Sequence, residues 1–327
     1  MKHNVKITLI LLSMFLITQF IGLYVINSDP FHITTEVNGA IETVSNPVLS
    51  WIEPPKIEQE SDFNLYLGSI IFAFVIAILI ILFLTKFKIA FILKAWFFTV
   101  VVIALFISMT AIFPKTFYFT VPALILALGF AFIKVFQRNI FIHNFTELLI
   151  YPGIAAVFVP ILNFWSILIL LLIISIYDMW AVWHSGIMQK MAKYQMENLK
   201  VFSGFFVPYI SKKLRDKLKK MKKAKKQNKS IKVNLAILGG GDVVFPIITA
   251  GVMLSLAKNN LFPEFLSNLA TPLFGIPGLF TALSVTFGAT LGLAGLFMFS
   301  KKKRFYPAMP FITSGILIGL ILSYLIL

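Results

Sequence analysis

Long apolar segments are the feature that most constrains the fold of this chain. A helix needs roughly 20 residues to cross the hydrocarbon core of a bilayer. Four apolar segments are about this long, namely residues 63–85, 95–114, 233–257 and 305–327. Helices satisfy their own backbone hydrogen bonds in lipid, and the alternating pattern of barrel strands is absent from the sequence. With 59% hydrophobic and 13% charged residues, the chain has too little polar surface to dissolve in water. We therefore expect an all-α integral membrane protein.

Nine transmembrane spans account for the apolar segments. Their expected ranges are 5–27, 63–85, 89–113, 116–134, 142–161, 162–185, 233–257, 278–300 and 305–326. The first could be a secretory signal peptide, because a basic start precedes an apolar run. The run is long and no small-x-small cleavage site follows it, so we expect a retained span.

Basic residues fall in alternate connectors, as the positive-inside rule requires of cytoplasmic loops. They are Lys2 and Lys6, Lys86 and Lys88, Lys134 and Arg138, the segment 186–232, and Lys301–Arg304. The longest of the opposite connectors, 28–62, is acidic. This alternation predicts a cytoplasmic N-terminus and an external C-terminus, and a cell-membrane location if the source is prokaryotic.

The connector charges divide the chain into three parts. We expect a membrane part at 1–185, a basic cytoplasmic loop at 186–232, and a second membrane part at 233–327. The loop holds about half of the basic residues of a chain whose formal net charge is +16. Beside membrane spans such a segment favours anionic lipid headgroups rather than nucleic acid as its partner.

Three acidic residues fall within the predicted spans, where an ionisable group is costly and indicates function. Glu147 lies near the cytoplasmic end of its span, so it can reach the interface or pair with a base such as Arg138. Asp178 and Asp242 lie in consecutive antiparallel spans, Asp178 roughly seven or eight residues and Asp242 about nine residues from the same face. At about 1.5 Å of rise per residue both lie about 11–14 Å below it, so they can face each other.

Two facing carboxyl groups in a low dielectric share a proton, because both cannot ionise easily. One can then accept a proton from water while the other donates to a carbonyl oxygen, which is the chemistry of an aspartic protease. The same two residues could instead serve a cation leak channel or a proton-coupled transporter. The chain has no cysteine and its four histidines are scattered, so we expect no metal and no cofactor.

The residues around Asp242 weaken the predicted helix. Three glycines, Gly239, Gly240 and Gly241, precede it, and each costs roughly 1 kcal/mol in helix propensity. Pro246 lacks the amide that would bond the carbonyl of Asp242, four residues earlier. Local unwinding beside the second carboxylate is therefore expected.

These residues resemble the motifs of presenilin and signal peptide peptidase, the intramembrane aspartyl proteases. Tyr177-Asp178 matches the YD motif, Leu238-Gly239-Gly240-Gly241-Asp242 the GxGD motif, and Pro307-Ala308-Met309-Pro310 the PALP motif, with Met309 in place of leucine. The nine-span layout with a long loop between the sixth and seventh spans is also similar. The basic loop and the cytoplasmic N-terminus resemble presenilin more closely than signal peptide peptidase. A single presenilin-like chain without partner-subunit features suggests a microbial, archaeal homologue. The prepilin peptidases, which also have a GxGD motif, have fewer spans and no proline motif.

The resemblance implies a role for each motif. Asp178 and Asp242 would be the catalytic pair, and Tyr177 would shape the site or pack between helices. Gly239 and Gly241 would let substrate approach, and the 307–310 stretch would hold an irregular backbone near the site. The implied activity is hydrolysis within transmembrane segments of single-span substrates, with no obligatory partner subunit evident. The Met309 departure is mild, because methionine and leucine have similar volumes.

Overall fold

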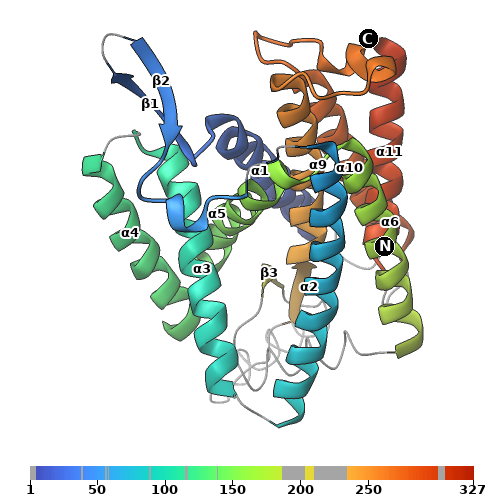
Figure 1. Ribbon diagram of the computed structural model, residues 1–327. Coiled ribbons are helices and arrows are strands. Elements are labelled where there is room, and N and C mark those ends of the chain that lie inside the picture. Colours follow the sequence, from blue (N-terminus) through green and yellow to red (C-terminus); the bar gives the residue numbers. More distant parts are fainter. Residues whose placement is uncertain are drawn as a thin grey trace, which may run out of the picture.

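The computed structural model describes residues 5–37, 40–55, 57, 59–87, 90–114, 117–137, 139–185, 203–209, 234–300 and 306–327. Helices dominate these ranges (Figure 1). The α-helices are α1 (Val5–Ser28), α2 (Glu60–Lys86), α3 (Ala90–Ile112), α4 (Phe117–Phe132), α5 (Ile140–Phe158), α6 (Phe164–Trp180), α9 (Gly240–Lys258), α10 (Leu279–Phe299) and α11 (Met309–Ile326). Shorter helical pieces are η1 (Ser50–Ile52), η2 (Ile133–Gln137), η3 (Val159–Ile161), η4 (Ala181–Ser185) and η6 (Glu264–Ala270).

Four short strands form two antiparallel pairs. In the first connector β1 (His32–Val37) pairs with β2 (Ala40–Ser45), with His32 opposite Ser45. Before α9, β3 (Gly204–Tyr209) pairs with β4 (Asn234–Gly239), with Gly204 opposite Gly239. The β1–β2 hairpin lies at the same end of the molecule as the C-terminus, at the top of Figure 1.

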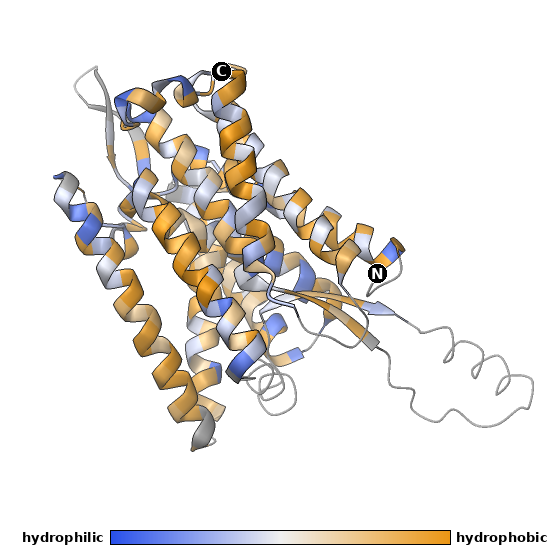
Figure 2. Cartoon of the chain, turned by 90° about the vertical axis from the view of Figure 1, so that its right-hand side faces the viewer, coloured by the Kyte–Doolittle hydropathy of each residue, from blue (hydrophilic) through white to orange (hydrophobic). Residues whose placement is uncertain are grey.

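The predicted spans are confirmed as helices in the part of the chain that the structure describes. Nine of these helices are long and apolar enough to cross a membrane. Apolar residues run along most of their length (Figure 2), and large apolar side chains such as Leu79, Phe91 and Phe141 lie exposed on the surface. An apolar surface of this kind is suited to contact with lipid chains and not to contact with water.

Two predicted boundaries were wrong in an informative way. The seventh span was expected to be helical from residue 233, but residues 234–239 form strand β4 and the helix begins at Gly240. The last span was expected from residue 305, but α11 begins at Met309. Both segments lie next to a motif, and both have an extended or irregular backbone there. Of the predicted basic loop 186–232, only residues 203–209 lie within the described ranges.

Helix α9 is the centre of the bundle. It contacts α1, α5, α6, α10 and α11, and 72% of its 18-residue apolar window is buried, compared with 6% for α2. The side chain of Gln19 in α1 reaches its first turn, where Nε2 donates to the carbonyl oxygen of Val243 at 3.0 Å. The helix that carries Asp242 of the GxGD motif is therefore held from several sides.

Helices α10 and α11 pack against each other at glycines. A Cβ added at Gly315 would lie 2.1 Å from the carbonyl oxygen of Gly288, and one added at Gly292 would lie 2.3 Å from that of Phe311. The glycines recur at four-residue spacing on both helices, which allows the two backbones to touch. This close contact holds the start of α11 in register with the rest of the bundle.

The glycine contact predicts different effects for two substitutions. Gly315→Ala should lower the Tm by several degrees, because overpacking at this rigid contact costs about 1–3 kcal/mol. Gly295→Ala on α10 is the matched control, since a Cβ there meets nothing within 4 Å. We expect its Tm to stay the same or rise slightly, because alanine favours helix. Thermal unfolding in detergent measures both, and equal Tm values for the two variants would contradict the packing role.

Candidate active site

Asp178 lies near the end of α6, where the helix changes its winding. The α-helical part of the span ends at Trp180, and residues 181–185 continue as a π-helical turn. Single π-helical turns within helices are frequent at functional sites. The Asp178 side chain is buried, with 6% relative exposure.

The proline motif supplies a hydrogen-bond donor to Asp178. The amide of Met309 donates to Asp178 Oδ2 at 3.0 Å, and the Ala308 amide is a second donor to the same carboxyl group. Both amides belong to the start of α11, where the first N–H groups of a helix have no partner within the helix. Pro310 follows directly and carries no amide of its own. Two predicted motifs, 131 residues apart in the chain, thus meet at one carboxyl group.

A second contact holds α6 against α11 one turn away from Asp178. Ser175 Oγ lies 2.8 Å from Thr313 Oγ1, and both side chains are buried. Because Ser175 precedes Asp178 by three residues and Thr313 follows Met309 by four, the two contacts lie on the same helix faces. Sequence reasoning missed this pair, since buried serine and threonine residues are common in membrane helices.

Asp242 lies in the first turn of α9, directly after strand β4. Its side chain turns back toward the helix start and accepts a hydrogen bond from the amide of Gly239, the N-cap residue. An acidic residue at the third helical position that bonds the N-cap amide has the geometry of a capping box. Helix α6, which carries Asp178, contacts α9.

The depth estimate for Asp242 assumed a helix from residue 233, and this assumption was wrong. A strand advances about 3.3 Å per residue, so β4 covers more distance than a helix of equal length. Helices α6 and α9 nevertheless contact each other, and the expected facing of Asp178 and Asp242 stays a prediction.

The three glycines have different surroundings. A Cβ at Gly239 would lie 3.1 Å from Asp242 Oδ2. A Cβ at Gly240 would lie 2.6 Å from Ser203 Oγ and 2.8 Å from the Tyr151 ring. Gly241 is exposed, and its added Cβ would meet only Phe245, at 4.0 Å. The preceding Leu238 is buried.

Tyr177 packs between helices. Its ring meets Phe74 of α2 edge to face, with centroids 5.3 Å apart, and it is half-buried. The packing role that we considered for this residue agrees with these contacts. A direct role in shaping the site stays a prediction.

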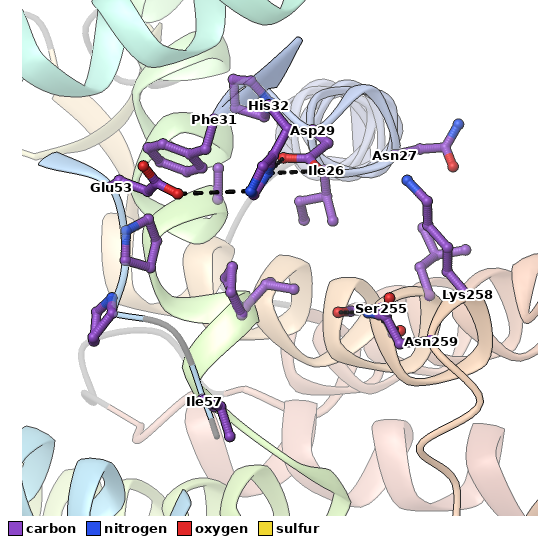
Figure 3. A pocket seen from close by; sticks show the side chains of 17 residues that line it. Ile26, Asn27, Asp29, Phe31, His32, Glu53, Ile57, Ser255, Lys258 and Asn259 are labelled. Atoms are coloured by element: carbon purple, nitrogen blue, oxygen red, sulfur yellow. Dashed lines mark hydrogen bonds and ion pairs between the residues drawn. The ribbon is translucent and has the colours of Figure 1, made fainter. Parts of the chain in front are cut away.

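A separate cavity lies at the far end of α9, about 20 Å from Asp242 at 1.5 Å per residue. Its volume is about 270 Å³, and Lys258, Glu53 and His32 are among the lining residues (Figure 3). His32 pairs with Asp29 at 3.1 Å and with Glu53 at 3.6 Å. Neither Asp178 nor Asp242 lines this cavity, so it is distinct from the candidate active site.

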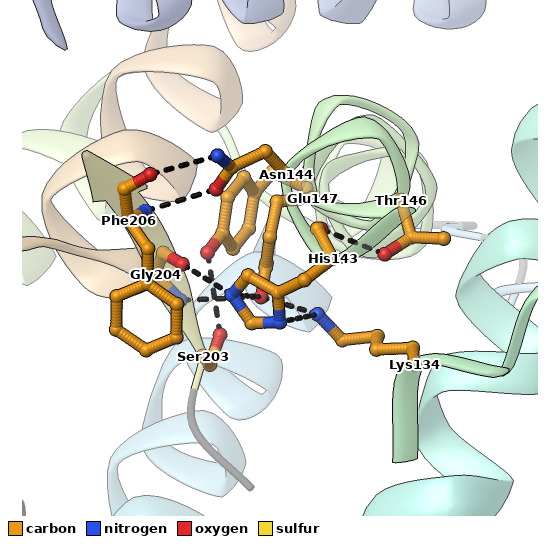
Figure 4. Close-up of polar contacts among 9 residues, drawn as sticks. Lys134, His143, Asn144, Thr146, Glu147, Ser203, Gly204 and Phe206 are labelled. Atoms are coloured by element: carbon orange, nitrogen blue, oxygen red, sulfur yellow. Dashed lines mark hydrogen bonds and ion pairs between the residues drawn. The ribbon is translucent and has the colours of Figure 1, made fainter. Parts of the chain in front are cut away.

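Of the two surroundings expected for Glu147, the interface or a basic partner, the structure shows a basic partner. The Glu147 side chain is fully buried and pairs with Lys134, whose Nζ lies 2.5 Å from Glu147 Oε1 (Figure 4). The expected partner Arg138 lies outside the described residues. The sequence offered a signal, because Lys134 and Glu147 are both ionisable and both fall within predicted spans.

Comparisons with known proteins agree with these features. A family model described as "Signal-peptide peptidase, presenilin aspartyl protease" matches residues 41–327. Two solved structures are similar, both described as a presenilin family intramembrane aspartate protease. The C222 crystal form has 17% identity and a TM-score of 0.57, with 98% of this chain and 99% of that chain covered. The P2 crystal form has 16% identity and a TM-score of 0.55, with 97% of each chain covered. A comparison with curated proteins finds no match.

The Ser175–Thr313 contact predicts a measurable coupling between α6 and α11. In a double-mutant cycle of Ser175→Ala and Thr313→Val, we expect a coupling energy of about 0.6 kcal/mol, the mean for hydrogen bonds between membrane helices. Unfolding of the four proteins in mixed micelles measures it. Additive effects of the two substitutions would show that the hydroxyl contact contributes nothing to stability.

Proposed function

Because the chain belongs to the signal-peptide peptidase and presenilin family of aspartyl proteases, we propose that Asp178 and Asp242 together hydrolyse peptide bonds within transmembrane segments. One observation carries the assignment of these residues. The amide of Met309 donates to Asp178, while Asp242 lies in the first turn of α9, which contacts both α6 and α11. These contacts support the proposal that three motifs, far apart in the sequence, form one site.

The reaction needs one protonated and one ionised carboxyl group. The ionised group accepts a proton from water while the water oxygen bonds to the carbonyl carbon of the peptide. The protonated group gives its proton to the carbonyl oxygen, which forms a tetrahedral diol. Proton transfer to the amide nitrogen then lets the C–N bond break, and a carboxyl and an amino terminus leave.

The substrate must be extended for this reaction. A transmembrane helix hides its peptide bonds in its own hydrogen bonds, so the substrate has to unwind near the two aspartates. Strand β4 ends three residues before Asp242, and the 307–310 stretch lies against Asp178. We infer that backbone groups of these segments pair with the extended substrate, as in strand addition. Single-span proteins are the simplest substrates, because only one helix has to enter and unwind.

The orientation and the basic segment complete the proposal. The distribution of lysine and arginine supports a cytoplasmic N-terminus and an external C-terminus. The segment 186–232 would then face the cytoplasm and contact anionic lipid headgroups. No finding favours the channel or transporter alternative for the same acids.

Loss of either carboxyl group should abolish cleavage. We expect Asp178→Ala and Asp242→Ala each to reduce cleavage of a transmembrane peptide by roughly 100- to 10,000-fold, because each removes half of the acid and base pair. Mass spectrometry of the products, with the purified protein in detergent, measures the loss. Glu264→Ala, which alters an exposed acid in η6, should cleave at the wild-type rate.

Retained cleavage in either aspartate variant would overturn the assignment. A mimic of the transition state, with a hydroxyl group in place of the attacked carbonyl, gives an independent test. It should bind the wild type tightly and compete with substrate. Ion flux in liposomes that depends on Asp178 or Asp242, without proteolysis, would instead support the channel alternative.

The glycines predict opposite effects for neighbouring substitutions. Gly241→Leu should reduce cleavage strongly with little change in Tm, because Gly241 is exposed beside Asp242 and its side chain would occupy the substrate's path. Gly240→Ala should lower the Tm, because its Cβ would press against Ser203 and Tyr151 and overpacking costs about 1–3 kcal/mol. Cleavage rate and thermal unfolding of both variants test the distinction. Wild-type cleavage by Gly241→Leu would exclude substrate passage at this glycine.

A further inference from the structure

A buried polar cluster lies beside the candidate active site but takes no part in the reaction above. It consists of Lys134 from η2 and His143, Asn144 and Glu147 from α5 (Figure 4). Lys134 and Glu147 have side-chain exposures of 1% and 0%. A buried ion pair adds little net stability, because the desolvation of both charges offsets their attraction. The cluster therefore calls for an explanation other than stability alone.

The α5 residues of the cluster bind the backbone of β3. Glu147 Oε1 accepts a hydrogen bond from the Gly204 amide at 3.2 Å, and His143 Nε2 lies 2.8 Å from the Gly204 carbonyl oxygen. Asn144 accepts from the Phe206 amide at 2.9 Å and donates to the Phe206 carbonyl oxygen at 2.8 Å. Side chains of α5 thus bind the backbone N–H and C=O groups of both Gly204 and Phe206. A neighbouring strand would bind the same groups of these two alternate residues.

Lys134 sets the orientation of these contacts. The Gly204 carbonyl can only accept, so His143 Nε2 carries the hydrogen. His143 Nδ1 of the neutral ring is then the acceptor, and Lys134 Nζ lies 3.2 Å from it. Since Lys134 also pairs with Glu147, one ammonium group orders both side chains that bind Gly204. The His143 ring further stacks on Phe206, with centroids 4.6 Å apart.

These bonds determine which edge of the sheet stays open. Antiparallel residues alternate between pairs that exchange hydrogen bonds and pairs that do not. Gly204 and Phe206 direct their backbone groups to α5, so the bonded pairs with β4 are Phe205 with Leu238 and Val207 with Ala236. The outer edge of β3 is closed by α5. Among the described residues, no backbone pairs with the outer edge of β4 at Leu235, which is exposed, and Ile237, and we infer that this edge receives the substrate strand.

The same bonds connect α5 to the catalytic pair. Helix α5 holds β3, β3 pairs with β4, and β4 runs directly into Gly239, which is the cap of α9 and the hydrogen-bond partner of Asp242. Tyr151 of α5 adds a contact at this junction, because its hydroxyl lies 3.3 Å from Ser203 Oγ. A shift of β3 would therefore move both the open strand edge and Asp242.

We propose that Lys134, His143, Asn144 and Glu147 are positioning residues, which hold the β3–β4 sheet so that an extended substrate lies in register with Asp178 and Asp242. This inference rests on the proposed function, since it concerns the same cleavage reaction. Misplacement of a reacting group by about 1 Å can cost on the order of 100-fold in rate. The cluster thus acts on the turnover rate through the sheet.

Two variants and one control test the proposal. Asn144→Leu removes both bonds to Phe206 at a half-buried position, so it should fold. Lys134→Met with Glu147→Gln removes both charges together and leaves no buried ion unpaired. Thr146→Val is the matched control, because Thr146 is buried on the same helix and its hydroxyl bonds only its own helix, at His143.

Cleavage of a single-span transmembrane peptide by the purified full-length chain in detergent gives kcat, KM and, in parallel, Tm. We expect Asn144→Leu and the double variant to lower kcat about 10- to 100-fold with KM within about twofold. Affinity for the hydroxyl mimic should fall by the same factor. Thr146→Val should keep the wild-type kcat even where its Tm falls as far as that of the test variants.

The inference would be overturned if both test variants kept a kcat within twofold of wild type. It would also be overturned if Thr146→Val lost kcat in proportion to its loss of Tm. Failure of the proposed function has a different signature. In that case the wild type does not cleave, or the Asp178→Ala protein does. A wild type that cleaves, an inactive Asp178→Ala and full activity in both test variants would reject the positioning role alone.

Discussion

Every feature of this structure depends on the requirement that backbone N–H and C=O groups find partners where no water is present. Helices meet this requirement within themselves, and this is why most of the described chain is helical. A protease inside a membrane also needs irregular backbone of its own beside an unwound substrate. Such backbone lies at β3, at β4 and before α11. At β3 and before α11 we can identify the groups that satisfy it, whereas the outer edge of β4 is the one proposed to receive a substrate strand.

The partners of the irregular segments are side chains on neighbouring helices. The amide of Met309 is bonded by Asp178, and the groups of Gly204 and Phe206 are bonded by α5. Asp178 therefore has two tasks, because the carboxyl group proposed to act in catalysis also satisfies the start of α11. The glycine contact between α10 and α11 and the Ser175–Thr313 pair hold that helix start in place.

Much of this arrangement could be predicted from the sequence. The apolar runs predict the helices, because length and composition decide whether a segment can cross lipid. The intramembrane position of Asp178 and Asp242 singles them out, since burial of an acid is costly. Strand β4 could not be predicted, because NLAILG is as apolar as a membrane helix and only pairing with β3 makes it a strand.

The cluster around Glu147 shows a second limit of sequence reasoning. The sequence offers Arg138 as an example of a basic partner for Glu147, but the partner is Lys134. Glu147 and Lys134 meet because a π-helical turn, η2, extends α4 and carries Lys134 to α5. Periodicity indicates neither such a turn nor the partner helix. The sequence therefore indicates a basic partner for Glu147 but does not indicate which basic residue it is.

The GGGD segment combines these constraints in one turn of chain. Gly239 has to be small because the Asp242 carboxyl group turns back against it. Gly240 has to be small because Tyr151 and Ser203 fill the space where its side chain would lie. Only Gly241 faces open space, so packing gives no reason for a glycine there, whereas passage of a substrate does. The first two glycines are thus explained by the protein's own packing. The third is explained by what has to reach Asp242, and for this reason it is the glycine whose replacement separates activity from stability.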